Sequence, residues 1–407
     1  MKNISYKLFS YFVMLNMFWL ISFSAFALYF GYLPAPFFYD SNDTFMDFFN
    51  VAYWAQRSDA FDFWRSIYFP FNLILSNFLF GDTFGVEPKI LRSHYYIQFA
   101  IYLSIYILSG FLIYLSVKRL KFSKGFCLLV TLAFFVSEPF WVALERGNFI
   151  VFALLFLLLR NFKKVYLDAV LLSLAVNVKI YLLPLLFSEL IRLKPIKYIY
   201  EIVIFFVTVV LFSILYSQPW FDSYLGNLTN FSKFGNGLLT SLWNPNSIFV
   251  YFDTAVQIFD GSITLILINI LKYLLLVPFL YIISALFFFG NRIDRVLIEF
   301  SILVFLLSIL QSPGGYSYLL LWAYLPTVLL NDKYRALLLP FLGTQMFFDI
   351  PVLPVEQYFG YNVMSYITGE NVVKNIYLST GPFIRIFSLF MISVILCKII
   401  RSEKNYV

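Results

Sequence analysis

Carboxylate side chains are concentrated in one hydrophilic stretch near the start of the chain, where Asp40, Asp43 and Asp47 fall within eight residues. Asp43 and Asp47 are four residues apart, so they share one face if this stretch is helical. A carboxylate held at the edge of a cavity accepts a proton from a hydroxyl group and so acts as a general base. A solvated acidic loop or a helix cap gives the same spacing. We select Asp47 as the candidate base, because it lies farthest from the preceding apolar run, and Asp43 as the alternative.

A second polar group, Glu145-Arg146-Gly147-Asn148, comes directly before an apolar run that we expect to be helical. A guanidinium at a helix N-terminus is a good anion site, because the side chain and the backbone N–H groups both attract negative charge. Arg146 is therefore a candidate phosphate ligand. The alternative is a self-neutralising ion pair between Glu145 and Arg146 at the membrane interface.

Two lysines lie among apolar residues. Lys179 falls between two short apolar runs, and an ionisable residue in such a place is a functional candidate. The alternative is a lysine that extends to the lipid headgroups. Lys272 lies inside a longer apolar run, and for it we expect a headgroup contact or a structural ion pair.

Two further segments carry groups that bind hydroxyl-rich ligands. Asn244 and Asn246 stand in Trp243-Asn244-Pro245-Asn246-Ser247, where amides and an aromatic ring suit a polyhydroxyl substrate, although Asn-Pro is also an ordinary turn signal. Tyr316 and Tyr318 follow Gly314-Gly315, and paired glycines allow close approach of a ligand to the backbone. A plain turn explains the glycines equally well.

The residues that must position these groups are mostly apolar. The chain has 407 residues, of which 61% are hydrophobic and 13% charged, with a mean hydropathy of +0.82. A soluble domain has roughly 45–50% apolar and about 25% charged residues. The composition therefore predicts an all-α polytopic membrane protein in a single domain, 1–407, and excludes a soluble enzyme. The single histidine and the two cysteines exclude a multi-histidine metal site and a disulfide framework, and we expect no metal or cofactor.

A helix that spans a membrane needs about 20 mainly apolar residues. Twelve segments are candidates: 8–30, 95–117, 126–140, 148–160, 165–178, 181–191, 199–216, 262–290, 294–310, 316–330, 335–348 and 380–400. The region 126–191 holds four short segments, and short or broken helices are tolerated where they line protein or a water-filled cavity. The first segment is longer than the apolar part of a usual signal peptide, so we expect it to remain as an anchor.

The positive charges predict the orientation. Most of the 29 lysine and arginine residues, including Arg160, Arg192 and Arg295, fall on the N-terminal side of the membrane if the twelve spans are threaded in order. Both termini are then cytoplasmic, and the long connections 31–94, 217–261 and 349–379 lie outside. The net charge of +7 is thereby assigned to topology and not to a nucleic-acid partner. The chain carries no nucleotide-binding motif, so its substrates must come from the membrane.

The order of these motifs resembles the GT-C superfamily of integral-membrane glycosyltransferases, and most closely glycosyltransferase family 87. The similarity covers about residues 40–325. The matching segments are Asp47-Phe48-Phe49-Asn50-Val51-Ala52-Tyr53, Tyr68-Phe69-Pro70-Phe71, Glu145-Arg146-Gly147-Asn148, Lys179-Ile180-Tyr181-Leu182-Leu183-Pro184, Asn246-Ser247 and Ser312-Pro313. The family has a histidine after Ser-Pro, and here Tyr316 or Tyr318 occupies that region.

The resemblance implies an inverting transfer of a sugar from a polyprenyl-phosphate donor to a hydroxyl of a cell-surface glycan or its lipid-linked precursor. It implies an active site on the outer face of a bacterial cytoplasmic membrane. Asp47 then acts as base, with Asp43 as runner-up, and Arg146 and Lys179 bind the donor phosphate. The expected substrate contacts are Glu145, Asn148, Asn244, Asn246, Tyr316 and Tyr318.

Two other functions remain open at this point. A polysaccharide polymerase or ligase that uses a polyprenyl-diphosphate glycan would need a similar outer cavity. A transporter or flippase for lipid-linked glycans would usually show internal repeats, and we find none in the sequence.

Overall fold

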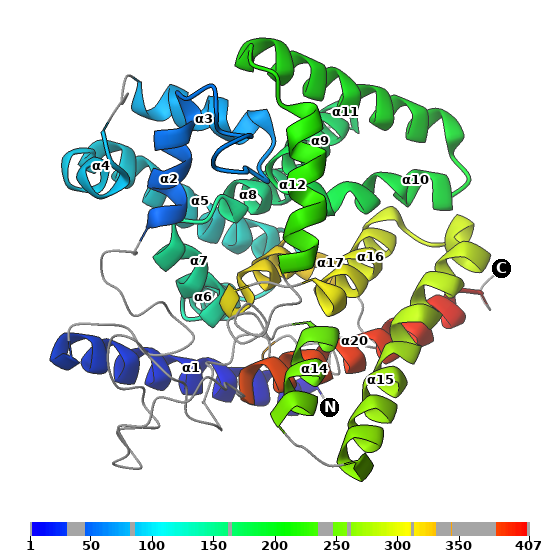
Figure 1. Ribbon diagram of the computed structural model, residues 1–407. Coiled ribbons are helices and arrows are strands. Elements are labelled where there is room, and N and C mark those ends of the chain that lie inside the picture. The colour runs from blue at the N-terminus through cyan, green and yellow to red at the C-terminus, as the bar shows by residue number, and fades with distance from the viewer. Residues whose placement is uncertain are drawn as a thin grey trace.

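The computed structural model describes residues 2–30, 45–81, 86–161, 165–234, 247–258, 262–310, 313–330, 343 and 380–404. Within these residues the regular elements are helices, and no strand occurs among them (Figure 1). The expected all-helical class is therefore confirmed for the described part of the chain.

Five helices of the described residues are long and apolar enough to cross a bilayer. They are α1 (Lys2–Phe30), α5 (Tyr96–Arg119), α11 (Pro195–Tyr216), α15 (Ser262–Phe289) and α20 (Thr380–Lys404). Each overlaps one of the expected spans. Their lengths and hydropathy are those of a multi-pass membrane protein.

A bent pair of helices replaces the single span expected at 126–140. Helix α6 (Lys124–Phe135) and helix α7 (Glu138–Arg146) meet at an angle of 47°. Pro139 lies in the first turn of α7, where its missing N–H is tolerated, but it could not continue a helix that began in α6. Helix α7 ends at Arg146, so the direction that the bend gives to α7 determines where that guanidinium lies.

The remaining expected spans are short helices packed inside the protein. They are α8 (Ile150–Arg160), α9 (Val165–Val178), the 3-10 helix η2 (Ile180–Phe187) with α10 (Ser188–Ile191), α16 (Arg295–Ile309), and the 3-10 helix η4 (Pro313–Tyr324) with α17 (Leu325–Leu330). Most residues of α8 and α16 are buried. The segment 335–348 lies outside the described residues except for Gly343, and the count of twelve spans stays a prediction.

The long connections 31–94 and 217–261 contain helices that we did not expect. These are α2 (Met46–Ala55), α3 (Pro70–Phe80), α4 (Pro88–His94), α12 (Phe221–Phe234) and α14 (Ile248–Ile258). A proline opens both α3 and α4, as is common at the first helical position. Helices α2 and α3 pack together through Phe48, Phe49 and Phe80, whose ring centroids are 5.1 to 5.6 Å apart. The connection 349–379 lies outside the described residues.

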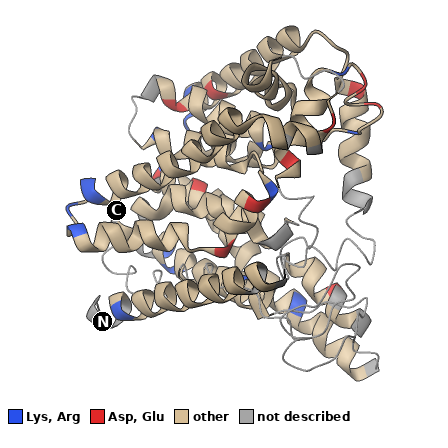
Figure 2. Ribbon diagram, turned by 90° about the vertical axis from the view of Figure 1, so that its left-hand side faces the viewer, with Lys and Arg blue, Asp and Glu red and all other residues tan. Residues whose placement is uncertain are grey.

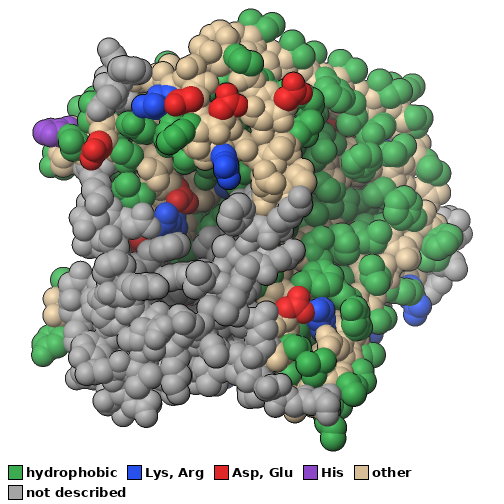
Figure 3. Space-filling model, in the orientation of Figure 1, with side chains coloured by type: hydrophobic (Ala, Val, Ile, Leu, Met, Phe, Trp, Pro, Cys, Tyr) green, Lys and Arg blue, Asp and Glu red, His purple; other side chains and the backbone are tan. Residues whose placement is uncertain are grey.

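Helices α11 and α15 have apolar surfaces that face away from the protein. Only 17% of the residues in the most apolar 18-residue stretch of each helix are buried. Phe206, Ile214 and Phe287 are among the exposed side chains. Figure 3 shows hydrophobic side chains covering the right-hand part of this face, where α11 and α15 lie in Figure 1. In α20 the corresponding buried share is 61%. Large exposed apolar surfaces mark a lipid contact, so α11 and α15 face the bilayer and α20 is central.

Both ends of the chain lie on one side of the molecule (Figure 2). Lysine and arginine residues gather near these ends in the same view. This arrangement is the one that the positive charges of the sequence predict.

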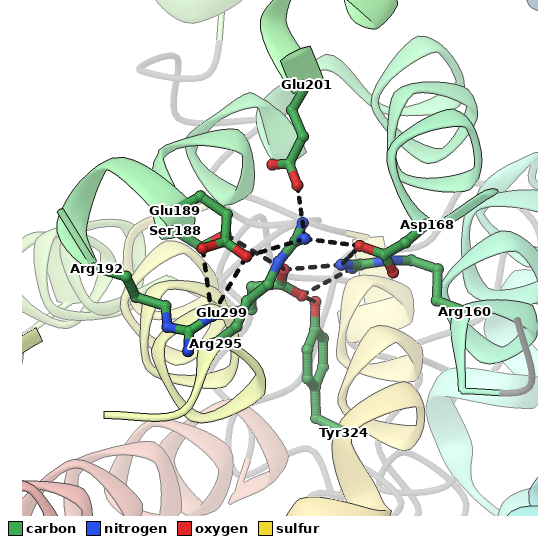
Figure 4. A network of polar contacts seen from close by, with 9 residues as sticks. All are labelled: Arg160, Asp168, Ser188, Glu189, Arg192, Glu201, Arg295, Glu299 and Tyr324. Atoms are coloured by element: carbon green, nitrogen blue, oxygen red, sulfur yellow. Dashed lines mark hydrogen bonds and ion pairs between the residues drawn. The ribbon is translucent and has the colours of Figure 1, made fainter. Parts of the chain in front are cut away.

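A buried ionic network joins the short helices (Figure 4). Its members are Arg160, Asp168, Ser188, Glu189, Arg192, Glu201, Arg295, Glu299 and Tyr324. Glu299 accepts hydrogen bonds from Arg160 and from Arg295, both at 2.7 Å. Arg295 also pairs with Asp168 at 2.7 Å and with Glu201 at 2.6 Å. The sequence predicts that these arginines set the orientation, and the structure shows that they also hold five helices together.

Candidate functional site

Asp47, the candidate base, is held by two residues that follow it by about a hundred positions in the sequence. Nη2 of Arg146 donates to Oδ1 of Asp47 at 2.8 Å, and Nδ2 of Asn148 donates to Oδ2 at 2.9 Å. The Asp47 side chain is 23% exposed and that of Arg146 is 10% exposed. Each carboxylate oxygen therefore has a fixed donor, and the carboxylate still has an open side.

Two backbone features bring these three residues together. Asp47 lies in the first turn of α2, and the N–H of Phe45 just before that helix donates to the carbonyl of Glu145 at 2.6 Å. Gly147 ends α7 with φ of +63°, a conformation in which a side chain is strained. A Cβ atom there would lie 2.9 Å from Cβ of Phe48. The glycine thus lets the turn after α7 pack directly on α2.

Asn148 is fixed in orientation by its other contacts. Its Oδ1 accepts from the N–H of Ile150 at 3.1 Å, so its Nδ2 group is left to face Asp47. Its carbonyl accepts from the hydroxyl of Tyr102 on α5 at 2.5 Å, and Tyr102 lies 3.3 Å from the hydroxyl of Tyr106. Asn148 therefore links the carboxylate to the buried interface between α5 and α8.

Lys179 lies between α9 and η2 and is only 8% exposed. Its Nζ atom is 5.1 Å from the ring centroid of Tyr68 and 5.6 Å from that of Tyr316. Among the described residues, the ammonium makes these ring contacts but no hydrogen bond or ion pair. Aromatic faces stabilise a cation without neutralising it, so the positive charge stays available for an anionic ligand.

Ring contacts connect Lys179 to the residues around Asp47, because Tyr68, which faces the ammonium, lies 6.1 Å from the ring of Phe149, the residue after Asn148. Burial lowers the pKa of Lys179 to about 8, and the negative charge of Asp47 acts in the opposite direction. Burial raises the pKa of Tyr68 above its ordinary range, and Asp47 contributes to that rise. The Asp47–Arg146 pair is formally neutral, so Lys179 supplies the excess positive charge of these three groups.

The two tyrosines of the Gly-Gly segment have different surroundings. Tyr316 lies against Lys179, and the neighbouring Ser317 is 3.1 Å from the hydroxyl of Tyr181. Tyr318 is buried and lies under the guanidinium of Arg385, which pairs with Glu138 at 3.0 Å. Tyr316 is therefore at the site, whereas Tyr318 supports the helices behind it.

The other expected site residues divide into two groups. Glu145 is buried beside Arg146, and its carbonyl holds the start of α2. Asp43, Asn244 and Asn246 lie outside the described residues.

Lys272 pairs with Asp253 and lies near the ring of Phe249, as expected for a structural ion pair.

Tyr68 was not selected as a site residue from the sequence. Its ring forms one wall around Lys179. The chain has 30 tyrosines, so residue type alone carries no signal, and only its place in the Tyr68-Phe69-Pro70-Phe71 segment could have singled it out.

Within the described residues, no three His, Cys, Asp or Glu side chains are grouped so that they could hold a metal ion. Comparison with known protein families, with curated proteins and with solved structures found no match. Function is therefore inferred from the chemistry of the site. A buried ammonium beside an oriented carboxylate can bind a phosphate-containing ligand and accept a proton from a hydroxyl group.

Proposed function

We propose that this protein is a membrane glycosyltransferase that moves a sugar from a polyprenyl-phosphate donor to a glycan hydroxyl. The observation that carries the proposal is the convergence of Asp47, Arg146, Asn148 and Lys179 from three distant parts of the chain. The similarity of their motifs to glycosyltransferase family 87 supports the same function.

Lys179 would bind the phosphate of the donor. A sugar phosphodiester carries one negative charge, which the ammonium of Lys179 complements. The ammonium is held between two aromatic rings in a buried position. A preorganised cation in a site with little water stabilises the charge that develops on the phosphate as its bond to the sugar breaks.

Asp47 would act as the base. It removes the proton of the acceptor hydroxyl while that oxygen forms a bond to the anomeric carbon of the donor sugar. The bond from that carbon to the phosphate oxygen breaks, and the lipid phosphate leaves from the opposite face with the bonding electrons. Attack and departure on opposite faces invert the anomeric configuration, and the proton remains on Asp47.

Arg146 and Asn148 would hold the carboxylate in position for this step. Each donates to a different oxygen of Asp47, so the carboxylate cannot rotate freely. Fixing a reacting group in this way lowers the barrier, and about 1 Å of misplacement costs on the order of 100-fold in rate. This assigns Arg146 mainly to Asp47, where the sequence had favoured the donor phosphate.

The experiment is a transfer assay with purified protein in liposomes, labelled polyprenyl-phosphate sugars and native membranes as the acceptor source. Wild-type protein should transfer label, and Asp47→Asn and Lys179→Ala should lose transfer. The matched controls are Asp222→Asn, an exposed carboxylate on α12, and Lys118→Ala, an exposed lysine near the ring of Tyr114.

Each outcome of this assay has a defined meaning. Transfer from polyprenyl-diphosphate oligosaccharides alone would replace the proposal by a polymerase or ligase. Retained transfer in both site variants would refute the assignment of the site.

A further inference from the structure

A hollow lies at the ends of α2, α3 and α11, and Asp47 is not among the residues that line it. It encloses about 560 Å³, and its lining includes Gln56, Arg57, Asn77, Gly81, Tyr216 and Gln218. Helices α2 and α3 lie side by side in Figure 1, and acidic and basic side chains gather on the corresponding part of Figure 3. The hollow is distinct from the catalytic group because none of its lining residues contacts Asp47 or Lys179.

The lining carries polar groups that can bind a ligand by hydrogen bonds. The hydroxyl of Tyr216 is buried and has no hydrogen-bond partner among the described residues. The amides of Asn77 and Gln218 are exposed. Nε2 of Gln56 donates to Oδ1 of Asn77 at 3.1 Å and to the carbonyl of Gly81, which fixes this wall of the hollow. A buried hydroxyl without a partner is unfavourable, so a ligand that bonds to Tyr216 would remove that cost.

Arg57, the charged side chain among the lining residues of the hollow, is paired with Asp59. Arg57 donates to both oxygens of Asp59 at 3.0 Å, and this hydrogen bonding lowers the pKa of Asp59 below its ordinary value. The pair therefore stays ionised and mutually neutralised near neutral pH. A balanced pair favours an uncharged, hydroxyl-rich ligand over a phosphate or an anionic headgroup.

A row of aromatic rings leads from the hollow toward Lys179. The guanidinium of Arg57 lies 4.9 Å from the ring of Trp54, which stacks on Trp64 with centroids 5.8 Å apart and planes 5° apart. Trp64 stacks in turn on Tyr68 at 6.1 Å. Tyr68 covers Lys179. Aromatic faces beside hydrogen-bonding groups are suited to sugars, which have an apolar face and a hydroxyl-bearing edge.

The distance between the two sites fits one extended ligand. Gln56 follows Asp47 by nine residues along α2 and its end, so the backbones of these two residues are about 14 Å apart along the helix axis at about 1.5 Å per residue. This separation exceeds the length of one sugar. A sugar in the hollow therefore cannot be the one that reacts at Asp47.

We propose that the hollow binds a neutral sugar of the acceptor glycan, at a distance from the sugar whose hydroxyl reacts. This inference rests on the proposed function and extends it, because it assigns the acceptor as an oligosaccharide that lies along Trp54, Trp64 and Tyr68. The donor occupies the Lys179 side of the same path.

The test measures saccharide binding without turnover. Detergent-purified full-length protein is titrated with neutral di- and trisaccharides of glucose, galactose and N-acetylglucosamine, with saturation-transfer NMR and tryptophan fluorescence as readouts. At least one saccharide should bind the wild type. Asn77→Ala and Gln218→Ala should each weaken its binding about tenfold, the effect of one lost hydrogen bond. Asn230→Ala, an exposed amide on α12, should leave binding unchanged.

Tyr216→Phe separates ligand binding from folding. The substitution removes a buried hydroxyl that has no partner among the described residues, so the melting temperature should stay the same or rise. Saccharide binding should nevertheless weaken by about tenfold. A merely structural role of Tyr216 would leave saccharide binding unchanged in this variant, and that result would count against the proposal.

Different results would reject the saccharide site in the hollow and the glycosyltransferase function. Asp47→Asn should bind saccharide normally, since Asp47 does not line the hollow. If wild-type protein transfers sugar but binds none of the saccharides, the hollow is not an acceptor site. The same conclusion follows if inorganic phosphate displaces the saccharide, or if Asn77→Ala and Gln218→Ala bind as the wild type does. If saccharide binds but no donor is used, the donor assignment fails instead.

Discussion

Arg146 and Asp47, 99 residues apart in the sequence, form an ion pair of 2.8 Å at the junction of α7 and α2. The contact gives the two cationic residues of the site different tasks. Arg146 orients the carboxylate, whereas the ammonium of Lys179 lies between aromatic rings. This division of roles can be measured.

Substitution of the two cations should affect different steps. Lys179→Ala removes the expected phosphate ligand and should weaken donor binding about 10- to 100-fold, since a charge-assisted contact is lost. Arg146→Ala frees Asp47 to rotate and should lower the transfer rate by about the same factor, with a smaller effect on donor affinity. Equilibrium donor binding and single-turnover transfer separate the two. Equal losses of affinity in both variants would show that Arg146 also holds the phosphate.

The pH dependence of donor binding should report the charge of Lys179. Burial lowers its pKa to about 8, so the ammonium predominates below that pH and the neutral amine above it. Donor affinity should therefore fall as the pH rises through about 8. Lys179→Arg should remove this fall, because a guanidinium stays charged, although its affinity should be lower throughout. Donor titrations from about pH 6 to about pH 10 test this, and an identical alkaline fall in Lys179→Arg would assign it to another group.

Gly147 should be intolerant of a side chain. Gly147→Ala places a Cβ atom 2.9 Å from Phe48 in a left-handed backbone conformation. The variant should be destabilised by more than about 1 kcal/mol and should lose activity, since the turn also positions Arg146 and Asn148. The control is Gly226→Ala on α12, where a Cβ meets open space and alanine favours the helix. Thermal unfolding compares the two, and equal melting temperatures would show that the turn relaxes freely.

The buried network around Glu299 should contribute more to stability than a surface ion pair. Glu299→Gln removes the buried carboxylate that pairs with both Arg160 and Arg295, which should destabilise the protein by about 3–5 kcal/mol. Asp59→Asn breaks the more exposed pair with Arg57, whose side chains are 37% and 34% exposed, and should have a much smaller effect. Thermal unfolding in the same detergent gives both values. A small effect of Glu299→Gln would show that the network is redundant.

The candidate site residues can be found from the sequence, but their partners cannot. Asp47, Arg146 and Lys179 stand out because charged residues are rare in apolar surroundings, and the structure places all three in one site. The contact of Arg146 with Asp47 depends on the bend at Pro139 and on the conformation of Gly147. Neither the angle nor the close approach can be derived from spacing alone.

Helices in the long connections were missed for a related reason. Helix α2 holds Asp47 on one side and apolar residues such as Phe48 and Phe49 on the other, and it is too short to read as a span. The ionic network was missed because Arg160 and Arg295 lie near the ends of apolar segments, where basic residues usually mark the cytoplasmic side. Burial of such residues depends on how helices far apart in the sequence pack.

Single-turnover transfer by Asp47→Asn, measured beside Asp222→Asn at equal expression, tests most directly whether Asp47 is the base. Asparagine keeps the size of the side chain but cannot accept the proton of the acceptor hydroxyl. We expect Asp47→Asn to lose transfer by more than about 100-fold, while donor binding remains and Asp222→Asn transfers normally. A near-normal rate of transfer in Asp47→Asn would contradict it.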